Sequence, residues 1–182
     1  MELECSKNIK LITFVTSKGN IDVKLFGNDN PLTVSNFIKN IKKGIYNKKS
    51  FHKIINYPTT KIIKSGKYIH NKSLKNNNPY NLMSTRKIPL EIGLKESKEP
   101  IYKKQFIDPI KLKKIRPLSG KGYLAMVKVG KSYSSSTEFF FILNRSSEFN
   151  GRYSIFGEVV NGFDILRKLE SKDNILKINL KN

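Results

Sequence analysis

Eight short apolar runs, most of them alternating with polar residues, follow one another along this chain of 182 residues. The first two are residues 10–17 (KLITFVTS) and 20–26 (NIDVKLF), and Lys18-Gly19 between them is typical of a tight turn, which predicts a β-hairpin. Similar runs lie at residues 50–55, 61–63, 122–129, 138–144, 152–160 and 174–180. Short strands of this kind favour a closed antiparallel barrel, because closure buries one face of every strand.

Two segments have helical periodicity instead. Asn30 and Pro31 suit the N-cap and the first helical position, and apolar residues then recur at helical spacing until Gly44. A shorter amphipathic helix is expected at residues 163–170 (FDILRKLE). The predicted fold class is therefore mainly β: a closed eight-stranded antiparallel β-barrel with two capping helices, in a single domain of residues 1–182.

Residues from about 65 to 120 lack clear periodicity. The segment HNKSLKNNNPYN (70–81) is polar and rich in turn-forming residues, whereas KIPLEIGL (87–94) suggests one brief strand. We expect this part of the chain to be a long irregular insertion in the barrel.

The chain is strongly basic, with 35 Lys and Arg residues against 14 Asp and Glu and a formal net charge of +21. Such a surface attracts polyanions non-specifically. Lys, Asn and Ile are all abundant here and all have A/T-rich codons, so mutational bias explains the same balance. We favour bias over nucleic-acid binding, because the lysines are spread along the chain and no recognisable nucleic-acid module accompanies them.

Several classes of site are not expected. Cys5 is the only cysteine, which excludes an internal disulfide, and together with His52 and His70 it forms no metal-ligand pattern. Neither a metal nor another cofactor is predicted. No apolar run approaches the roughly 18 residues that cross a bilayer, and the N-terminus lacks the pattern of a signal peptide, so we expect a soluble chain.

Four blocks of sequence resemble a known family in order and spacing. They are PLTVSNFIKNIKKGIYNKKSFHKII (31–55), GYLAMVKV (122–129), STEFFFILN (136–144) and NGRYSIFGEVVNGFDIL (150–166). Together they resemble the cyclophilin-type peptidyl-prolyl cis-trans isomerases, and STRKIPLEIGLKESKEPIY (84–102) is similar to the cyanobacterial and plastid branch of that family. A plastid-type organelle or the cytoplasm would fit this kinship, and the sequence leaves the compartment open.

The resemblance implies three catalytic positions. Lys53 stands where the family has the Arg of a Phe-His-Arg trio, Glu138 replaces a Gln that bonds the substrate backbone, and Phe140 forms the floor of the proline pocket. Lys keeps the charge of Arg but lacks its planar fork, and Glu accepts hydrogen bonds without donating them. We expect Glu138 to pair with Lys53, and we expect His52 to point away from the groove because strand residues alternate.

The resemblance also assigns a set of substrate-binding residues: Ile62, Lys64, Met126, Val127, Lys128, Phe149 and Tyr153. Two registers of residues 56–67 remain open, since either Lys64 or Lys61 takes the position of a second Gln, with Ile62 or Thr59 as the apolar wall. Glu148 occupies a rim position that is often Trp, which implies weak cyclosporin binding at most.

We expect a monomer whose partners are proline-containing peptides or protein clients. Three candidate functions remain for such a chain. The first is a cyclophilin-like isomerase with weak or absent catalysis, as the changes at Lys53 and Glu138 imply. The second is a non-catalytic chaperone or assembly scaffold that uses the apolar half of the site. The third is a basic protein associated with nucleic acid, whose affinity would fall steeply with salt.

Overall fold

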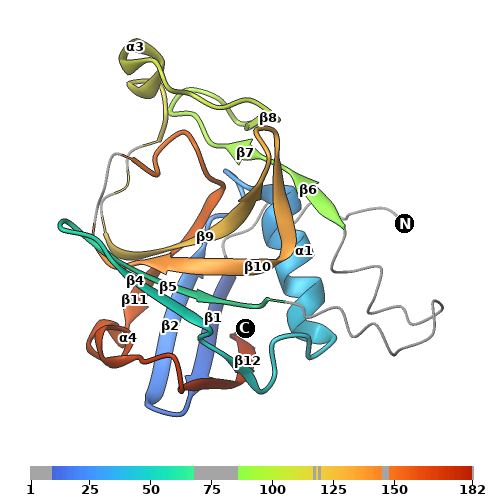
Figure 1. Ribbon diagram of the computed structural model, residues 1–182. Helices are drawn as coiled ribbons and strands as arrows, with labels where there is room; N and C mark the ends of the chain where they lie inside the picture. Colours follow the sequence, from blue (N-terminus) through green and yellow to red (C-terminus); the bar gives the residue numbers. More distant parts are fainter. Residues whose placement is uncertain (1–9, 68–85, 117, 119, 145–147, 182) are drawn as a thin grey trace.

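The computed structural model describes residues 10–67, 86–116, 118, 120–144 and 148–181 (Figure 1). The helices are α1 (Pro31–Lys42), α3 (Pro109–Leu112) and α4 (Phe163–Lys168). The strands are β1 (Lys10–Thr16), β2 (Gly19–Leu25), β3 (Lys49–Ser50), β4 (Lys53–Asn56), β5 (Lys61–Ser65), β6 (Lys87–Pro89), β7 (Glu91–Ile92), β8 (Ile101–Tyr102), β9 (Lys121–Val129), β10 (Tyr133–Ile142), β11 (Ile155–Asn161) and β12 (Asn174–Lys181).

A single curled antiparallel sheet of ten strands dominates the structure (Figure 1). Its order is β3-β12-β1-β2-β11-β9-β10-β5-β4, and β6 adds to the side of β10. The two strands at the ends of this order, β3 and β4, are consecutive in the chain, because only Phe51 and His52 lie between them. The predicted mainly β, antiparallel fold is confirmed, and the short strands β3 and β6 account for the difference between eight strands and ten.

The interior of the curled sheet is filled by aromatic rings. Phe37 of α1 packs against Phe14, Phe139 and Phe156, with ring centroids 6.3, 5.5 and 5.0 Å apart. All four rings are fully buried. The apolar stripe predicted for the first helix is therefore core, and the helix closes one side of the interior.

The start of α1 differs from the prediction in one respect. Asn30 is the N-cap residue, but its side chain makes no capping hydrogen bond and donates instead to the carbonyl of Ile155 at 2.9 Å. The carboxylate of Glu91 takes over that role, accepting hydrogen bonds from the backbone N–H groups of Leu32 and Thr33 at 3.0 and 2.7 Å. A residue far along the chain thus satisfies the helix terminus, where a negative charge is also favourable.

Replacing Glu91 by Ala is expected to lower the free energy of unfolding by about 2 kcal/mol, because two helix-terminal N–H groups lose their acceptor. Burial raises the pKa of Glu91 above its ordinary value of 4.5, so the folded chain holds this proton more tightly than the unfolded chain. The contribution of Glu91 to stability therefore falls as the pH rises from 4.5 through the folded-state pKa.

Urea unfolding from mildly acidic to neutral pH measures this effect. The difference in unfolding free energy between the wild type and Glu91→Ala should shrink as the pH rises. Exposed Glu96 offers a matched control, and Glu96→Ala should leave the stability nearly unchanged across the range. A difference that grows with pH for Glu91→Ala would contradict this account of the buried carboxylate.

The expected irregular insertion is more ordered than the sequence indicated. Its described part, residues 86–116, contains β6, β7, β8 and α3, and the single strand expected within residues 87–94 is present as β6 and β7. A separate small core holds it together: Leu90, Ile92, Phe106 and Ile115, with Leu94, Ile101 and Leu112 packed against them. Strands of two or three residues are too short to produce a periodic pattern, so the sequence did not predict the order of this segment. The polar segment 70–81 was also assigned to this insertion, and it lies outside the described residues.

Both predicted helices are present, as α1 and α4, and the described residues contain a further short helix, α3, that was not predicted. This helix has only four residues and lies at one end of the molecule, beyond β7 and β8 (Figure 1). Among the helices of the described residues, none has the length and apolar character needed to cross a membrane.

Candidate functional site

Strand pairing aligns several of the predicted site residues in one row across the outer face of the sheet. Lys53 of β4 lies opposite Lys64 of β5, and Lys64 lies opposite Phe140 of β10. The row continues from Phe140 to Ala125 of β9 and then to Ile155 of β11. Directly opposed residues in antiparallel strands project to the same face, so these five residues form what we call the central row.

An apolar cluster surrounds the central row on this face, and we call it the outer cluster. The ring of Phe140 is 3% exposed and contacts the rings of Phe149 and Tyr153, with centroids 5.9 and 5.3 Å away. The buried members are Ile62, Tyr123, Ala125, Phe140, Ile142 and Ile155, and the partly buried ones are Ile55, Leu118, Val127, Phe149 and Tyr153. Phe139 and Phe141 belong to the inner core, so the alternation expected for EFFFILN is confirmed.

The strand register also decides between the two alternatives for residues 56–67. Lys64 is in the central row and Ile62 is in the outer cluster. Lys61 instead donates hydrogen bonds from Nζ to the carbonyls of Arg167 and Leu169, at the end of α4. The geometry therefore supports the register in which Lys64 and Ile62 belong to the site.

The segment Met126-Val127-Lys128 is divided between the two faces. Val127 packs against the outer cluster, and Nζ of Lys128 lies 5.3 Å from the centre of the Tyr153 ring. Met126 is fully buried in the inner core, so its side chain does not reach the outer face. Its assignment as a binding residue is corrected accordingly, because alternation along β9 turns it inward.

Two expectations for the polar residues were wrong. Glu138 does not pair with Lys53, because its Oε1 lies 3.2 Å from Nε2 of His52, with both side chains 24% exposed. His52 consequently faces the groove side and not the barrel wall. The alternation rule failed because β4 begins only at Lys53, which leaves His52 in the connection from β3.

Three lysines border the outer cluster: Lys53 and Lys64 at one end of the central row and Lys128 beside Tyr153. None of the three forms an ion pair with any residue that the structure describes. The one carboxylate on β10 beside them, Glu138, is engaged by His52. The site therefore combines an apolar floor with a cationic border.

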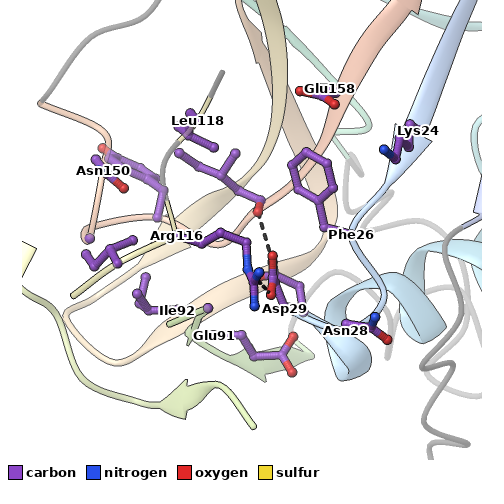
Figure 2. Close-up of a pocket in the computed structure, with 16 residues that line it drawn as sticks. Lys24, Phe26, Asn28, Asp29, Glu91, Ile92, Arg116, Leu118, Asn150 and Glu158 are labelled. Carbon is purple, nitrogen blue, oxygen red and sulfur yellow. Dashed lines mark hydrogen bonds and ion pairs between the residues drawn. The ribbon is translucent and has the colours of Figure 1, made fainter. Parts of the chain in front are cut away.

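A cavity of about 330 Å³ lies next to the outer cluster (Figure 2). The two share Leu118, Tyr153 and Ile155 as walls. Within the lining of the cavity, Nε of Arg116 donates to Oδ1 of Asp29 at 2.7 Å, one of the interactions drawn as dashed lines in Figure 2. Burial raises the pKa of Asp29, and the neighbouring Arg116 opposes part of that rise. Phe140 is not among the residues that line the cavity, so the cavity adjoins the outer cluster at the Ile155 end of the central row without extending to Phe140.

Comparison with known proteins agrees with the architecture. The family model described as cyclophilin type peptidyl-prolyl cis-trans isomerase/CLD matches residues 11–180. Peptidyl-prolyl cis-trans isomerase B of Escherichia coli is 28% identical over 170 residues, which cover 88% of this chain and 84% of that protein. Peptidyl-prolyl cis-trans isomerase-like 2 of Rhizopus delemar is 31% identical over 157 residues, 86% of this chain, but the match spans only 24% of that longer protein.

Solved structures share the fold at lower sequence identity. A cyclophilin type peptidyl-prolyl cis-trans isomerase from Cryptosporidium parvum matches with a TM-score of 0.64 and 22% identity, covering 96% of this chain and 99% of that one. A second crystal structure of that protein, obtained in the presence of the dipeptide Ala-Pro, matches with a TM-score of 0.62 and 21% identity, over 94% and 99% of the two chains. On the strength of the family model, which spans nearly the whole sequence, this chain belongs to the cyclophilin-type peptidyl-prolyl cis-trans isomerase family.

Proposed function

We propose that the chain binds proline-containing segments over the outer cluster and accelerates their cis-trans isomerisation at a reduced rate. The observation that carries this proposal is the central row, in which two cationic side chains lie in register with the buried ring of Phe140. The half-buried rings of Phe149 and Tyr153, with the buried ring of Phe140 packed against both, form an aromatic surface of the kind that holds a pyrrolidine ring.

The chemistry requires little more than this arrangement. An amide resists rotation by roughly 18 to 20 kcal/mol because its resonance is lost in the twisted state. A donor that favours the twisted amide lowers this barrier without any nucleophile or metal. Lys53 is the donor in this proposal, and its single ammonium group lacks the fixed fork with which a guanidinium would hold two substrate atoms at once.

Glu138 is a second reason to expect reduced activity. Its carboxylate accepts hydrogen bonds only, whereas a Gln amide would also donate one to a substrate carbonyl. Glu138→Gln is expected to tighten the binding of an Ala-Pro peptide about fivefold, since one hydrogen bond contributes about 1 kcal/mol. Isothermal calorimetry measures the change, with Glu96→Gln as the control because Glu96 is exposed and belongs neither to the outer cluster nor to the cavity beside it. A Glu138→Gln variant that binds more weakly than the wild type would show that the carboxylate itself is needed.

A non-catalytic scaffold is the second candidate function. It is favoured by the contrast within the site, since the apolar residues of the family pattern are retained while Lys53 and Glu138 depart from it. A peptide assay separates the two functions. Faster cis-trans exchange of an Ala-Pro peptide supports the isomerase, whereas saturable binding with an unchanged exchange rate supports the scaffold.

We also infer that the chain lies closest to the cyanobacterial and plastid branch of the family. The inference rests on the stretch Pro89-Leu90-Glu91-Ile92, which includes the carboxylate that bonds the start of α1. A phylogenetic tree that places the chain outside that branch would overturn it.

A further inference from the structure

We propose that this site selects proline segments in which the residue before the proline carries an anionic side chain, a carboxylate or a phosphate. The inference rests on the proposed binding of proline over the outer cluster and adds the class of substrate. It follows from the placement and surroundings of Lys53 and Lys64.

Two cations directly opposite each other on neighbouring strands are an unfavourable arrangement. Lys53 and Lys64 are such a pair, and their Cβ atoms lie about 5 Å apart in a standard antiparallel ladder. Like charges at this position destabilise a sheet, and an anion placed between the two ammonium groups would relieve the repulsion.

The surrounding residues do not supply that anion. Among the described residues, neither Lys53 nor Lys64 has an ion-pair partner. The carboxylate nearest in sequence to Phe140, Glu138, lies 3.2 Å from His52. Lys61, on the same strand as Lys64, shows the contrast, because its Nζ donates to two backbone carbonyls. The lysine pair is therefore available to an incoming ligand.

The geometry relates the lysine pair to one position of the substrate. Lys64 is one strand spacing, about 4.8 Å, from Phe140, where the proline ring would sit. The amide that Lys53 would act on joins the proline to the residue before it. In this proposal the side chain of that preceding residue extends toward Lys64, which lies between Phe140 and Lys53 in the central row. A carboxylate or phosphate on that side chain would form a charge-assisted hydrogen bond with the Lys64 ammonium, while Lys53 faces the amide.

Peptides of the form Ala-Xaa-Pro-Ala test the proposal, with Gln, Glu or phosphoserine as Xaa, and calorimetry gives each dissociation constant. The wild type should bind the Glu peptide about tenfold more tightly than the Gln peptide, which corresponds to one new charge-assisted interaction. A further gain for phosphoserine would assign the site to phosphate, and no further gain would assign it to carboxylate. Either result supports the anionic class.

Two variants make the test specific. In Lys64→Gln the ratio of the Gln-peptide to the Glu-peptide dissociation constant should fall to near one, whereas in Lys177→Gln, on the exposed face of β12, it should stay near the wild-type value. Equal affinity of the wild type for the Gln and Glu peptides would overturn the anionic preference while leaving proline binding intact. No binding of any of the peptides would overturn the proposed function itself.

Discussion

Replacing Phe140 by Leu is expected to weaken the binding of an Ala-Pro peptide by about 10- to 100-fold, because the floor of the outer cluster loses its aromatic face. In the structure the Phe140 ring contacts both Phe149 and Tyr153, the latter edge-on at 5.3 Å, so one substitution removes two ring contacts as well as the surface offered to proline. Titration of the peptide into each variant, followed by calorimetry, measures the loss.

Phe141→Leu is the matched control for this experiment. Phe141 is the next residue on β10, is fully buried, and packs in the inner core against Phe14 at 5.3 Å. Its replacement should lower the free energy of unfolding by about 1 kcal/mol or more while leaving peptide affinity within about twofold of the wild type. Urea unfolding of both variants shows that each is folded. Equal losses of affinity in the two variants would contradict the assignment of binding to the outer face.

Lys53→Arg is expected to raise the isomerisation rate constant per enzyme about 10- to 100-fold. A guanidinium presents a rigid planar set of donors, whereas the ammonium of Lys53 is a single point on a flexible stem. One preorganised donor is typically worth about 10²–10³ in rate, so restoring its geometry should recover a large part of that factor. Exchange spectroscopy on the proline resonances of an Ala-Pro peptide reports the rate directly.

The control for this substitution is Lys177→Arg, which makes the same chemical change at an exposed position of β12. The control should leave the exchange rate unchanged. If Lys53→Arg also leaves it unchanged while peptide affinity is retained, the missing guanidinium is not the main limit on the rate, and the scaffold function gains support.

The parts of the fold that could be predicted from sequence are those in which a local rule is rigid. Side chains alternate strictly along a paired strand, so EFFFILN sufficed to turn Phe140 outward and Phe139 and Phe141 inward. The same rule failed at His52, which precedes β4 and is not bound by its alternation. The prediction for Met126 was wrong for a related reason. Three consecutive residues, 126–128, were all assigned to the binding face, although alternation along β9 turns Met126 inward.

Other features depend on contacts between distant segments and leave no local signal. Asn30 has the residue type of a helix cap, yet Glu91 accepts the hydrogen bonds, and nothing near Asn30 in the sequence points to it. The register of residues 56–67 was undetermined because the turn before β5 has no fixed length, and only the pairing of Lys64 with Phe140 decides it. The small core around Phe106 and Ile115 was missed because its strands and helix are only two to four residues long.

The central claim is that a proline segment binds over the row formed by Lys53, Lys64 and Phe140. Backbone resonances of the isotope-labelled chain, followed during titration with an Ala-Pro peptide, test it most directly. The account predicts that the largest shifts fall on Ile62, Lys64, Phe140 and Tyr153, together with faster exchange between the cis and trans proline signals. Shifts centred instead on Asp29 and Arg116 in the neighbouring cavity, or no shifts at saturating peptide, would contradict it.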